Sequence, residues 1–176
     1  MTARIAILTV SDRAARGAYE DRGGPACEAW LREVITTPVE ILRRITEDGA
    51  APVAAALTDL ADTWGADLIL VTGGTGPAPR DRTPEGVAAV IDFDLPGFGE
   101  AMRAANLRVV ATAILSRQGA GVRGKTLIIT LPGSPNAIGS SLDAVFAAVP
   151  YCLDLIGAAR IETDPARIKT HRPKPA

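Results

Sequence analysis

The chain has 176 residues, a formal net charge of −1 and an apolar fraction of 47%, which suits one domain with a real core. The near-neutral charge excludes the basic surplus that attracts nucleic acid or anionic lipid, and no apolar run reaches the length of a membrane span. We therefore expect no nucleic-acid partner and no membrane contact. Because residues 1–10 lack a signal-peptide layout, a cytoplasmic location is the default expectation.

Apolar runs typical of strands alternate along the chain with segments of helical spacing. Strands are predicted at 3–10, 39–45, 67–72, 108–115 and 125–131, and helices at 25–35, 51–64, 83–91, 96–107 and 135–156, the last either straight or bent at Pro150. This alternation predicts one α/β domain with a mostly parallel sheet. Ligands of such sheets bind beyond the carboxyl ends of the strands, so the loops that follow the strands are where a site is expected.

The C-terminal segment 161–176 is basic, contains prolines and shows no periodicity, so we expect a loose, solvated tail. It holds the only histidine, His171, which nearly excludes Ser-His-Asp and Cys-His mechanisms. The two cysteines, Cys27 and Cys152, are far apart and lack CxxC spacing. They indicate neither a zinc site nor a disulfide framework, and we expect two reduced thiols that are mostly buried.

Two strand ends share one pattern of glycine, small polar residue, proline and helix. The first is "TGGTG" at 72–76, followed by Thr83 and Pro84, which suit the cap and first turn of a helix. Glycines let backbone N–H groups approach an anion closely, but a tight turn that needs glycine explains the run almost as well. The second is "LPGSPNA" at 131–137, where Ser134 is a possible cap, and good helix-start chemistry alone explains it.

Carboxylates follow the predicted strands at the same edge of the sheet. Asp48 lies after one strand and Asp81 lies in the glycine loop. Beside an anion site they would repel phosphate, unless a divalent cation such as Mg²⁺ lies between them. A helix N-cap for Asp48 and a loop-bracing Asx turn for Asp81 remain open alternatives. In the charged loop 11–24, Asp12, Arg13 and Asp21 are further candidates to reach a ligand, although a solvated loop explains most of its residues.

The combination of "TVSDRAARGAYEDRGGPACEAWL", "VTGGTGPAPRDRTPE", "LPGFGEAMR", "AILSRQGAGVRGKTLIITLPGSPNA" and "VPYCLDLI" resembles the MogA/MoaB molybdenum-cofactor biosynthesis family, and within it the MogA branch, the molybdopterin adenylyltransferases. The resemblance runs from residue 4 to about 156. It implies a three-layer α/β/α domain over 1–160, with 161–176 outside it. It also implies a homotrimer that uses Mg²⁺ and ATP to adenylylate the terminal phosphate of molybdopterin and releases pyrophosphate.

The resemblance also implies roles for individual residues. Asp48 and Asp81 match the family's two essential aspartates, and we expect them to be catalytic and to hold Mg²⁺. Ser11 and Asp12 are placed on the nucleotide side. The residues expected to bind substrate are Thr72, Gly73, Gly74, Thr75, Gly76, Ser116, Arg117, Pro132, Gly133, Ser134 and Pro135.

The MoaB branch supplies the competing expectation. A scaffold or carrier of MoaB type would hold molybdopterin without turnover, and it would have no need of carboxylates beside an anion site. The aspartate pair therefore favours the enzyme. The resemblance further implies that a separate molybdenum insertase uses the product, and a transient contact with that enzyme is an open expectation.

Overall fold

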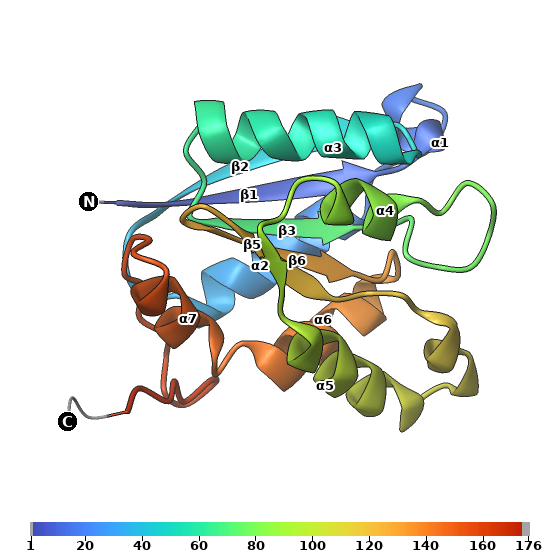
Figure 1. The fold of residues 1–176 in the computed structure, drawn as a ribbon. Helices are drawn as coiled ribbons and strands as arrows, with labels where there is room; N and C mark the ends of the chain where they lie inside the picture. Colours follow the sequence, from blue (N-terminus) through green and yellow to red (C-terminus); the bar gives the residue numbers. More distant parts are fainter. Residues whose placement is uncertain (1, 174–176) are drawn as a thin grey trace.

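A six-stranded sheet with the order β2-β1-β3-β6-β5-β4 forms the centre of the molecule (Figure 1). The computed structural model describes residues 2–173. The strands are β1 (Ala3–Val10), β2 (Val39–Thr46), β3 (Leu68–Thr72), β4 (Phe93–Asp94), β5 (Ala120–Arg123) and β6 (Thr126–Leu131). The strands β2, β1, β3 and β6 are parallel, whereas β5 is antiparallel to β6 and β4 to β5. The expected α/β domain with a mostly parallel sheet is confirmed.

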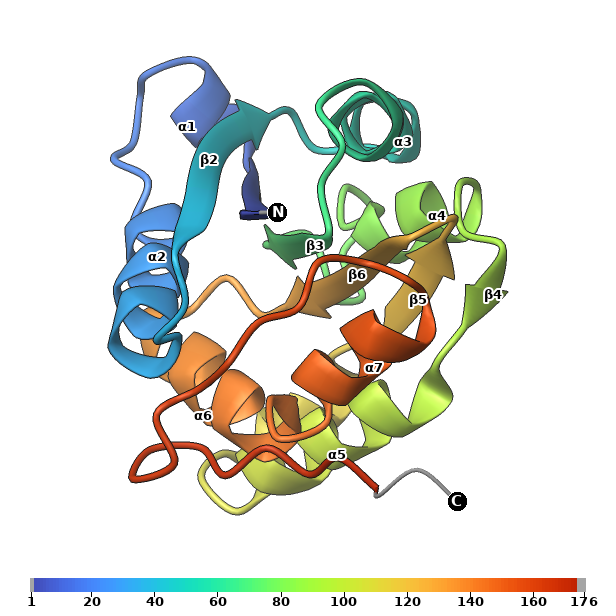
Figure 2. The same ribbon diagram turned by 90° about the vertical axis from the view of Figure 1, so that its left-hand side faces the viewer.

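Helices cover both faces of this sheet and make three layers (Figure 2). One face carries α3 (Ala50–Thr58), the π-helical turn η1 (Asp59–Thr63) and α4 (Thr83–Ala88). The other face carries α2 (Gly23–Val34), α5 (Pro96–Leu107), α6 (Pro135–Val145) and α7 (Val149–Leu155). The short helix α1 (Asp12–Ala15) and the 3₁₀ helix η2 (Ala111–Leu115) lie in loops beyond strand ends.

The central strands are almost entirely apolar, with only threonine as a polar residue, because they are covered on both faces. Every residue of β3 and β6 is buried. Alternate side chains of these strands enter the two cores: Leu68 and Leu70 pack under α2 and α6, while Ile69 and Val71 pack under α3 and α4. Continuous apolar runs of this kind are typical of parallel strands between two helical layers.

The predicted strand at 108–115 is wrong. This segment contains the turn that follows α5 and the 3₁₀ helix η2, and it lies outside the sheet. Val109 is 81% exposed and Ile114 is 67% exposed. Its β-branched residues suit a strand locally, but strand propensity mainly measures fit to a covered sheet surface, and no sheet surface covers these side chains.

Two short strands were not predicted. The strand β5 begins at Ala120, inside the expected loop 116–124, and pairs with β6 across a turn at Gly124, whose φ is +55°. The strand β4 adds only Phe93 and Asp94 to the edge. Glycine lowers strand propensity, so "GAGVRG" resembles a loop when only local sequence is considered.

The helix predicted at 135–156 is two helices, α6 and α7, bent by 61° at a break before Pro150. Pro150 lies in the first turn of α7, where the missing N–H costs no hydrogen bond. In the described part of the chain no single helix is long and apolar enough to cross a membrane, and α6 and α7 pass that test only as this bent pair.

The expected loose tail is wrong for residues 161–173. Ile161 and Ile168 are buried in the core beneath α2 and α7. A β-bridge joins Thr163 to Ile35 at the end of α2. Arg172 donates from Nε to Asp154 at 2.5 Å and from Nη1 to Glu162 at 2.9 Å. The segment therefore packs as part of the domain, and residues 174–176 lie outside the described part of the chain.

Candidate functional site

Two adjoining cavities lie at the carboxyl ends of β1, β3 and β6. These strand ends are at the right-hand side of Figure 1. We call the cavities the Asp81 cavity, of about 450 Å³, and the Ser11 cavity, of about 410 Å³. Gly73 and Gly133 line both, so the two glycine-containing loops form the boundary between them. Parallel strands place their loops at one edge, and this is where ligands of open α/β sheets bind.

The structure brings most of the predicted substrate-binding residues to these cavities. The Asp81 cavity is lined by Gly73, Gly74, Thr75, Gly76, Asp81, Ser116, Pro132 and Gly133. The Ser11 cavity is lined by Ser11, Thr72, Gly73, Gly133, Ser134 and Pro135. Asp12, Asp48 and Arg117 line neither.

Glycine is required in the first half of the "TGGTG" loop. Gly73 has φ +99° and Gly74 has φ +64°, values that L side chains rarely adopt. A Cβ on Gly73 would lie 2.4 Å from the Val10 carbonyl oxygen, and one on Gly74 would lie 2.4 Å from Thr83 Oγ1. The loop thus makes a close approach both to β1 and to the start of α4.

The carbonyl groups of this loop all point into the protein. Thr83 donates from Oγ1 to the Gly73 carbonyl at 2.8 Å and from its backbone N–H to the Gly74 carbonyl at 3.1 Å. Arg117 donates from its backbone N–H to the Thr75 carbonyl at 2.7 Å and from Nε to the Gly76 carbonyl at 3.0 Å. Within residues 2–173, the N–H groups of Gly74, Thr75 and Gly76 have no acceptor. Unpaired amides in a glycine turn with positive φ form a concavity that binds anions.

Thr83 therefore does not cap its helix as predicted. Arg82 occupies the N-cap of α4, and the Thr83 side chain is fully buried and bonds the glycine loop instead. Ser134 does occupy the N-cap of α6, but its hydroxyl makes no capping hydrogen bond. Because it lines the Ser11 cavity, that hydroxyl is available to a ligand.

Asp81 braces its own loop, but not through the Asx turn named as the alternative, because it bonds a residue before it in the chain. Its Oδ2 accepts from the Ala78 N–H at 3.2 Å, and the Asp81 N–H donates to the Ala78 carbonyl at 2.9 Å. The Oδ1 atom has no partner among the described residues, and the side chain is half-buried at the cavity wall. The brace and a role in binding a cation are compatible, because they use different oxygens.

Asp48 is held by Asp12 and not by a helix start. Asp12 Oδ1 accepts from the Asp48 N–H at 3.0 Å, and Asp48 Oδ2 accepts from the Asp12 N–H at 3.0 Å. Gly49, with φ +123°, is the N-cap of α3, so the expected alternative of an Asp48 cap is wrong. The pair links the loops after β1 and β2, next to Ser11, whose N–H donates to Thr46 O at 2.9 Å.

Ser116 and Arg117 follow η2 and diverge in direction. Ser116 lines the Asp81 cavity. The guanidinium of Arg117 donates to the Gly76 carbonyl, the Asp81 carbonyl and the Glu85 carboxylate, the last at 2.5 Å. The hydrogen bond from Arg117 is the largest cause of the lowered pKa of Glu85. The guanidinium is thus engaged within the protein, in contrast to the substrate contact expected for Arg117.

Several residues of the two cavities were not predicted. Asn106, at the end of α5, is buried and donates to Ser141 Oγ at 2.9 Å at the wall of the Asp81 cavity. In the Ser11 cavity, Tyr19 and Arg22 were not predicted, whereas Arg13 and Asp21 were expected to reach a ligand and do line it. Arg13 and Arg22 lie 4.9 and 5.8 Å from the ring of Tyr19. Nothing in the sequence distinguishes Asn106 from any other polar residue of a predicted helix. By contrast, an aromatic residue between arginines in "SDRAARGAYEDRGG" is a pattern from which a binding role could have been predicted.

The described residues contain no group of three or more His, Cys, Asp or Glu that could hold a metal ion by themselves. Mg²⁺ is usually held by one or two carboxylates together with phosphate oxygens, so this finding does not conflict with a substrate-completed site. The histidine and the two cysteines line neither cavity. His171 is exposed, and burial raises the pKa of Cys27 to about 12. Such a thiol is not a nucleophile at neutral pH.

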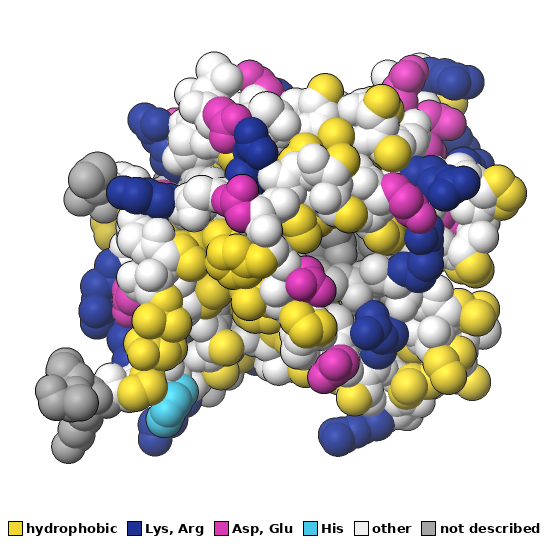
Figure 3. All heavy atoms as spheres, in the orientation of Figure 1, with side chains coloured by type: hydrophobic (Ala, Val, Ile, Leu, Met, Phe, Trp, Pro, Cys, Tyr) yellow, Lys and Arg dark blue, Asp and Glu magenta, His cyan; other side chains and the backbone are white. Residues whose placement is uncertain are grey.

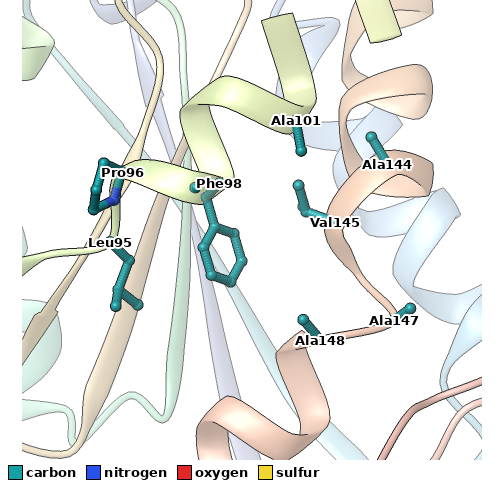
Figure 4. Close-up of a pocket in the computed structure, with 9 residues that line it drawn as sticks. Leu95, Pro96, Phe98, Ala101, Ala144, Val145, Ala147 and Ala148 are labelled. Atoms are coloured by element: carbon teal, nitrogen blue, oxygen red, sulfur yellow. The ribbon is translucent and has the colours of Figure 1, made fainter. Parts of the chain in front are cut away.

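A separate apolar cavity of about 400 Å³ lies between α5 and the α6–α7 junction (Figure 4). Phe98 and Val145 face it, and no ionisable residue lines it. Exposed apolar side chains also gather on and before η2, seen as yellow spheres at the lower right of Figure 3. Of these, Val110 and Leu115 form part of the wall of the Asp81 cavity. Apolar surface next to polar groups suits a ligand that has both apolar and polar parts.

Comparison with known proteins gives a consistent result. The family described as "probable molybdopterin binding domain" matches residues 6–151. The molybdopterin adenylyltransferase of Escherichia coli (strain K12) is 44% identical over 99% of this chain and 96% of its own length. The molybdopterin adenylyltransferase of Helicobacter pylori (strain 26695) is 46% identical over 98% of both chains.

A solved structure supports the same assignment. The crystal structure of the molybdopterin biosynthesis enzyme MoaB from Thermus thermophilus superposes with a TM-score of 0.81 and 42% identity, covering 90% of this chain and 99% of that one. Fold and sequence agree, and the chain belongs to the family of molybdopterin-binding domains of molybdenum cofactor biosynthesis.

Proposed function

We propose that this chain is a molybdopterin adenylyltransferase, which transfers AMP from ATP to the terminal phosphate of molybdopterin and releases pyrophosphate. The observation that carries the proposal is the glycine loop between two cavities, with unpaired N–H groups at Gly74 to Gly76 and the carboxylate of Asp81 beside them. Relatives with this name match 98–99% of the chain at 44–46% identity.

The reaction joins two anions and needs little proton transfer. A phosphate oxygen of molybdopterin attacks the α-phosphorus of ATP, a new P–O bond forms, and the bond to the bridging oxygen breaks as pyrophosphate leaves. Because the second pKa of a phosphate monoester is about 6, the attacking oxygen is already ionised at neutral pH. Catalysis is then mainly positioning and charge neutralisation, which agrees with a site that contains no histidine.

The two cavities suit the two substrates. We place the molybdopterin phosphate and pterin in the Asp81 cavity, with Ser116, the glycine loop and Pro132 as contacts. The nucleotide then occupies the Ser11 cavity, where Arg13 and Arg22 supply positive charge for its phosphates. The reacting atoms would meet at Gly73 and Gly133, the residues common to both cavities. Unpaired backbone amides there would stabilise the charge that develops at the α-phosphoryl group.

Mg²⁺ would be held by Asp81 and Asp48, and it would neutralise the phosphate charge. The donor set fits a hard cation, because each of these carboxylates has one oxygen without a partner among the described residues. Asp81 lines a cavity directly, whereas Asp48 is placed behind the Ser11 cavity by its bonds to Asp12. The protein's own part is to fix these side chains before substrate arrives.

A molybdopterin scaffold of MoaB type, which would bind molybdopterin without turnover, is the alternative. A homotrimer, transient contact with a molybdenum insertase and a cytoplasmic location also remain proposals that follow the family resemblance. Sedimentation of the purified chain tests the first of these, since a trimer has a mass of about three times 18.3 kDa.

Substitution of the aspartates separates the two candidate functions. In Asp81→Asn the amide oxygen still accepts from Ala78 N, so the loop brace stays while the negative charge is lost. We expect molybdopterin-dependent pyrophosphate release to fall about 10²–10³-fold, with molybdopterin binding retained. Asp48→Asn is expected to behave alike. Asp59→Asn, an exposed carboxylate paired with Arg44, is the matched control. Unchanged turnover in both site variants would remove the metal role.

A further inference from the structure

Arg117 and Glu85 connect the glycine loop to α4 through a set of bonds that the proposed reaction does not itself require. Arg117 contacts three loop carbonyls, at Thr75, Gly76 and Asp81, and its Nη1 lies 2.5 Å from Glu85 Oε1. Arg82 lies 3.4 Å from the same carboxylate oxygen and donates from Nε to Pro79 O at 3.2 Å. Arg117 and Arg82 thus bond carbonyls along the loop from Thr75 to Asp81, and both pair with the carboxylate of Glu85.

The consequence for the loop is directional. A peptide whose carbonyl is bonded on one side presents its N–H toward the opposite side. The backbone N–H of Arg117 bonds the Thr75 carbonyl, so that peptide presents the N–H of Gly76 toward the opposite side. The Nε of Arg117 bonds the Gly76 carbonyl and fixes the peptide that leads into Pro77, which has no N–H. Arg117 also bonds the carbonyl of Asp81, whose side chain lines the cavity. Arg117 thus holds the end of the glycine run through its backbone N–H and its guanidinium, and the guanidinium also holds the backbone of Asp81.

Glu85 gives the guanidinium a fixed orientation. A carboxylate and a guanidinium form two parallel hydrogen bonds in one plane, and Arg117 meets Glu85 through Nη1 at 2.5 Å and Nη2 at 3.4 Å. The two side chains are 38% and 37% exposed, so the ion pair by itself contributes little to global stability. Its effect is therefore expected to be local to the loop.

We propose that Glu85 and Arg117 are positioning residues, which orient the glycine loop and Asp81 for phosphate binding and turnover. Neither touches substrate in this arrangement. The effect on turnover rests on the proposed function, whereas the effect on the loop does not.

The test compares Arg117→Ala, Arg117→Lys and Glu85→Gln with wild type. The control is Arg123→Ala. Arg123 pairs with Asp62 at 2.6 Å and donates to the Val90 carbonyl, so its loss removes similar interactions, but it lines neither cavity. We expect Arg117→Ala to lower kcat on the order of 100-fold, as small misplacements at reacting groups do. Arg117→Lys should restore part of this loss, because it keeps the charge but not the fork.

Hydrogen–deuterium exchange of the peptide that spans 73–85 is the second readout. In Arg117→Ala we expect exchange in this peptide to rise on the order of 10-fold, with the rest of the chain unchanged. Exchange equal to wild type, a rise spread over the whole domain, or a kcat loss no larger than in Arg123→Ala would each overturn the proposal. If wild type released no pyrophosphate with molybdopterin, the proposed function would fail. The exchange measurement would still show whether Arg117 orders the glycine loop.

Discussion

Asp12 and Asp48 each accept a hydrogen bond from the backbone N–H of the other, both at 3.0 Å. This reciprocal pair joins the loop after β1 to the loop after β2, two segments that are 36 residues apart. Each aspartate keeps one carboxylate oxygen free of protein donors within the described residues. The backbone of one loop therefore positions the candidate metal ligand of the other, before any substrate or cation is bound.

Loss of the Asp12 side chain should destabilise this junction. Asp12→Ala removes the acceptor for the Asp48 N–H, and hydrogen bonds to charged groups contribute about 1.5–3 kcal/mol. Asp12→Asn keeps an oxygen acceptor, so we expect a loss below about 1 kcal/mol. Urea unfolding of the two variants measures the difference. Equal stability of Asp12→Ala and wild type would mean that the pair is incidental.

The glycine loop should not accept a side chain. Gly73→Ala would force an L residue to φ +99° and place Cβ 2.4 Å from the Val10 carbonyl oxygen. We expect a loss of more than about 1 kcal/mol and loss of phosphate binding. Gly139→Ala, within α6 and with no atom near the added Cβ, should instead stabilise by about 0.5–1 kcal/mol. Thermal unfolding of both variants checks the contrast, and a neutral Gly73→Ala would contradict it.

The C-terminal segment should contribute to stability but not to chemistry. Ile161 is fully buried, so Ile161→Ala is expected to cost about 2–5 kcal/mol in the free energy of unfolding. His171 is exposed, and His171→Ala should change stability by less than about 0.5 kcal/mol and leave turnover intact. A large loss of activity in His171→Ala would require a different mechanism, one that uses an imidazole.

The Glu85–Arg117 pair predicts a pH dependence. Hydrogen bonding from Arg117 holds the pKa of Glu85 below its ordinary value of 4.5, and Arg82 adds to this effect. A lowered pKa means that the contribution of the pair is present above pH 4.5 and is lost as pH falls through the folded value. The stability difference between wild type and Glu85→Gln should thus be constant near neutral pH and shrink below pH 4.5. A difference that grew toward low pH would have the wrong sign.

Much of the fold follows from local sequence. The helix predicted at 96–107 has the observed bounds of α5, because Pro96 suits its first turn and its apolar residues have helical spacing. The runs in β1, β3 and β6 identify buried strands. The failures are tertiary in origin. Nothing local shows that Val109 and Ile114 lack a sheet to cover them, or that Ile161 and Ile168 pack beneath α2.

The site was predicted in outline and not in its contacts. Strand ends and glycine runs located both cavities, since parallel strands place their loops at one edge. The partners of individual side chains could not be predicted, because hydrogen bonds such as Thr83 to Gly73 or Arg117 to Gly76 depend on how distant loops meet. For the same reason nothing in the local sequence indicated that Asp12, and not a helix start, would hold Asp48.

The central claim is the transfer of AMP to molybdopterin, and pyrophosphate release from ATP and Mg²⁺, measured with and without molybdopterin, tests it most directly. The account predicts release that depends on molybdopterin, is matched by adenylyl-molybdopterin, and is lost in Asp81→Asn. Tight binding of molybdopterin with no pyrophosphate under any divalent metal would contradict it, and Asp81 would then be only the brace of its own loop.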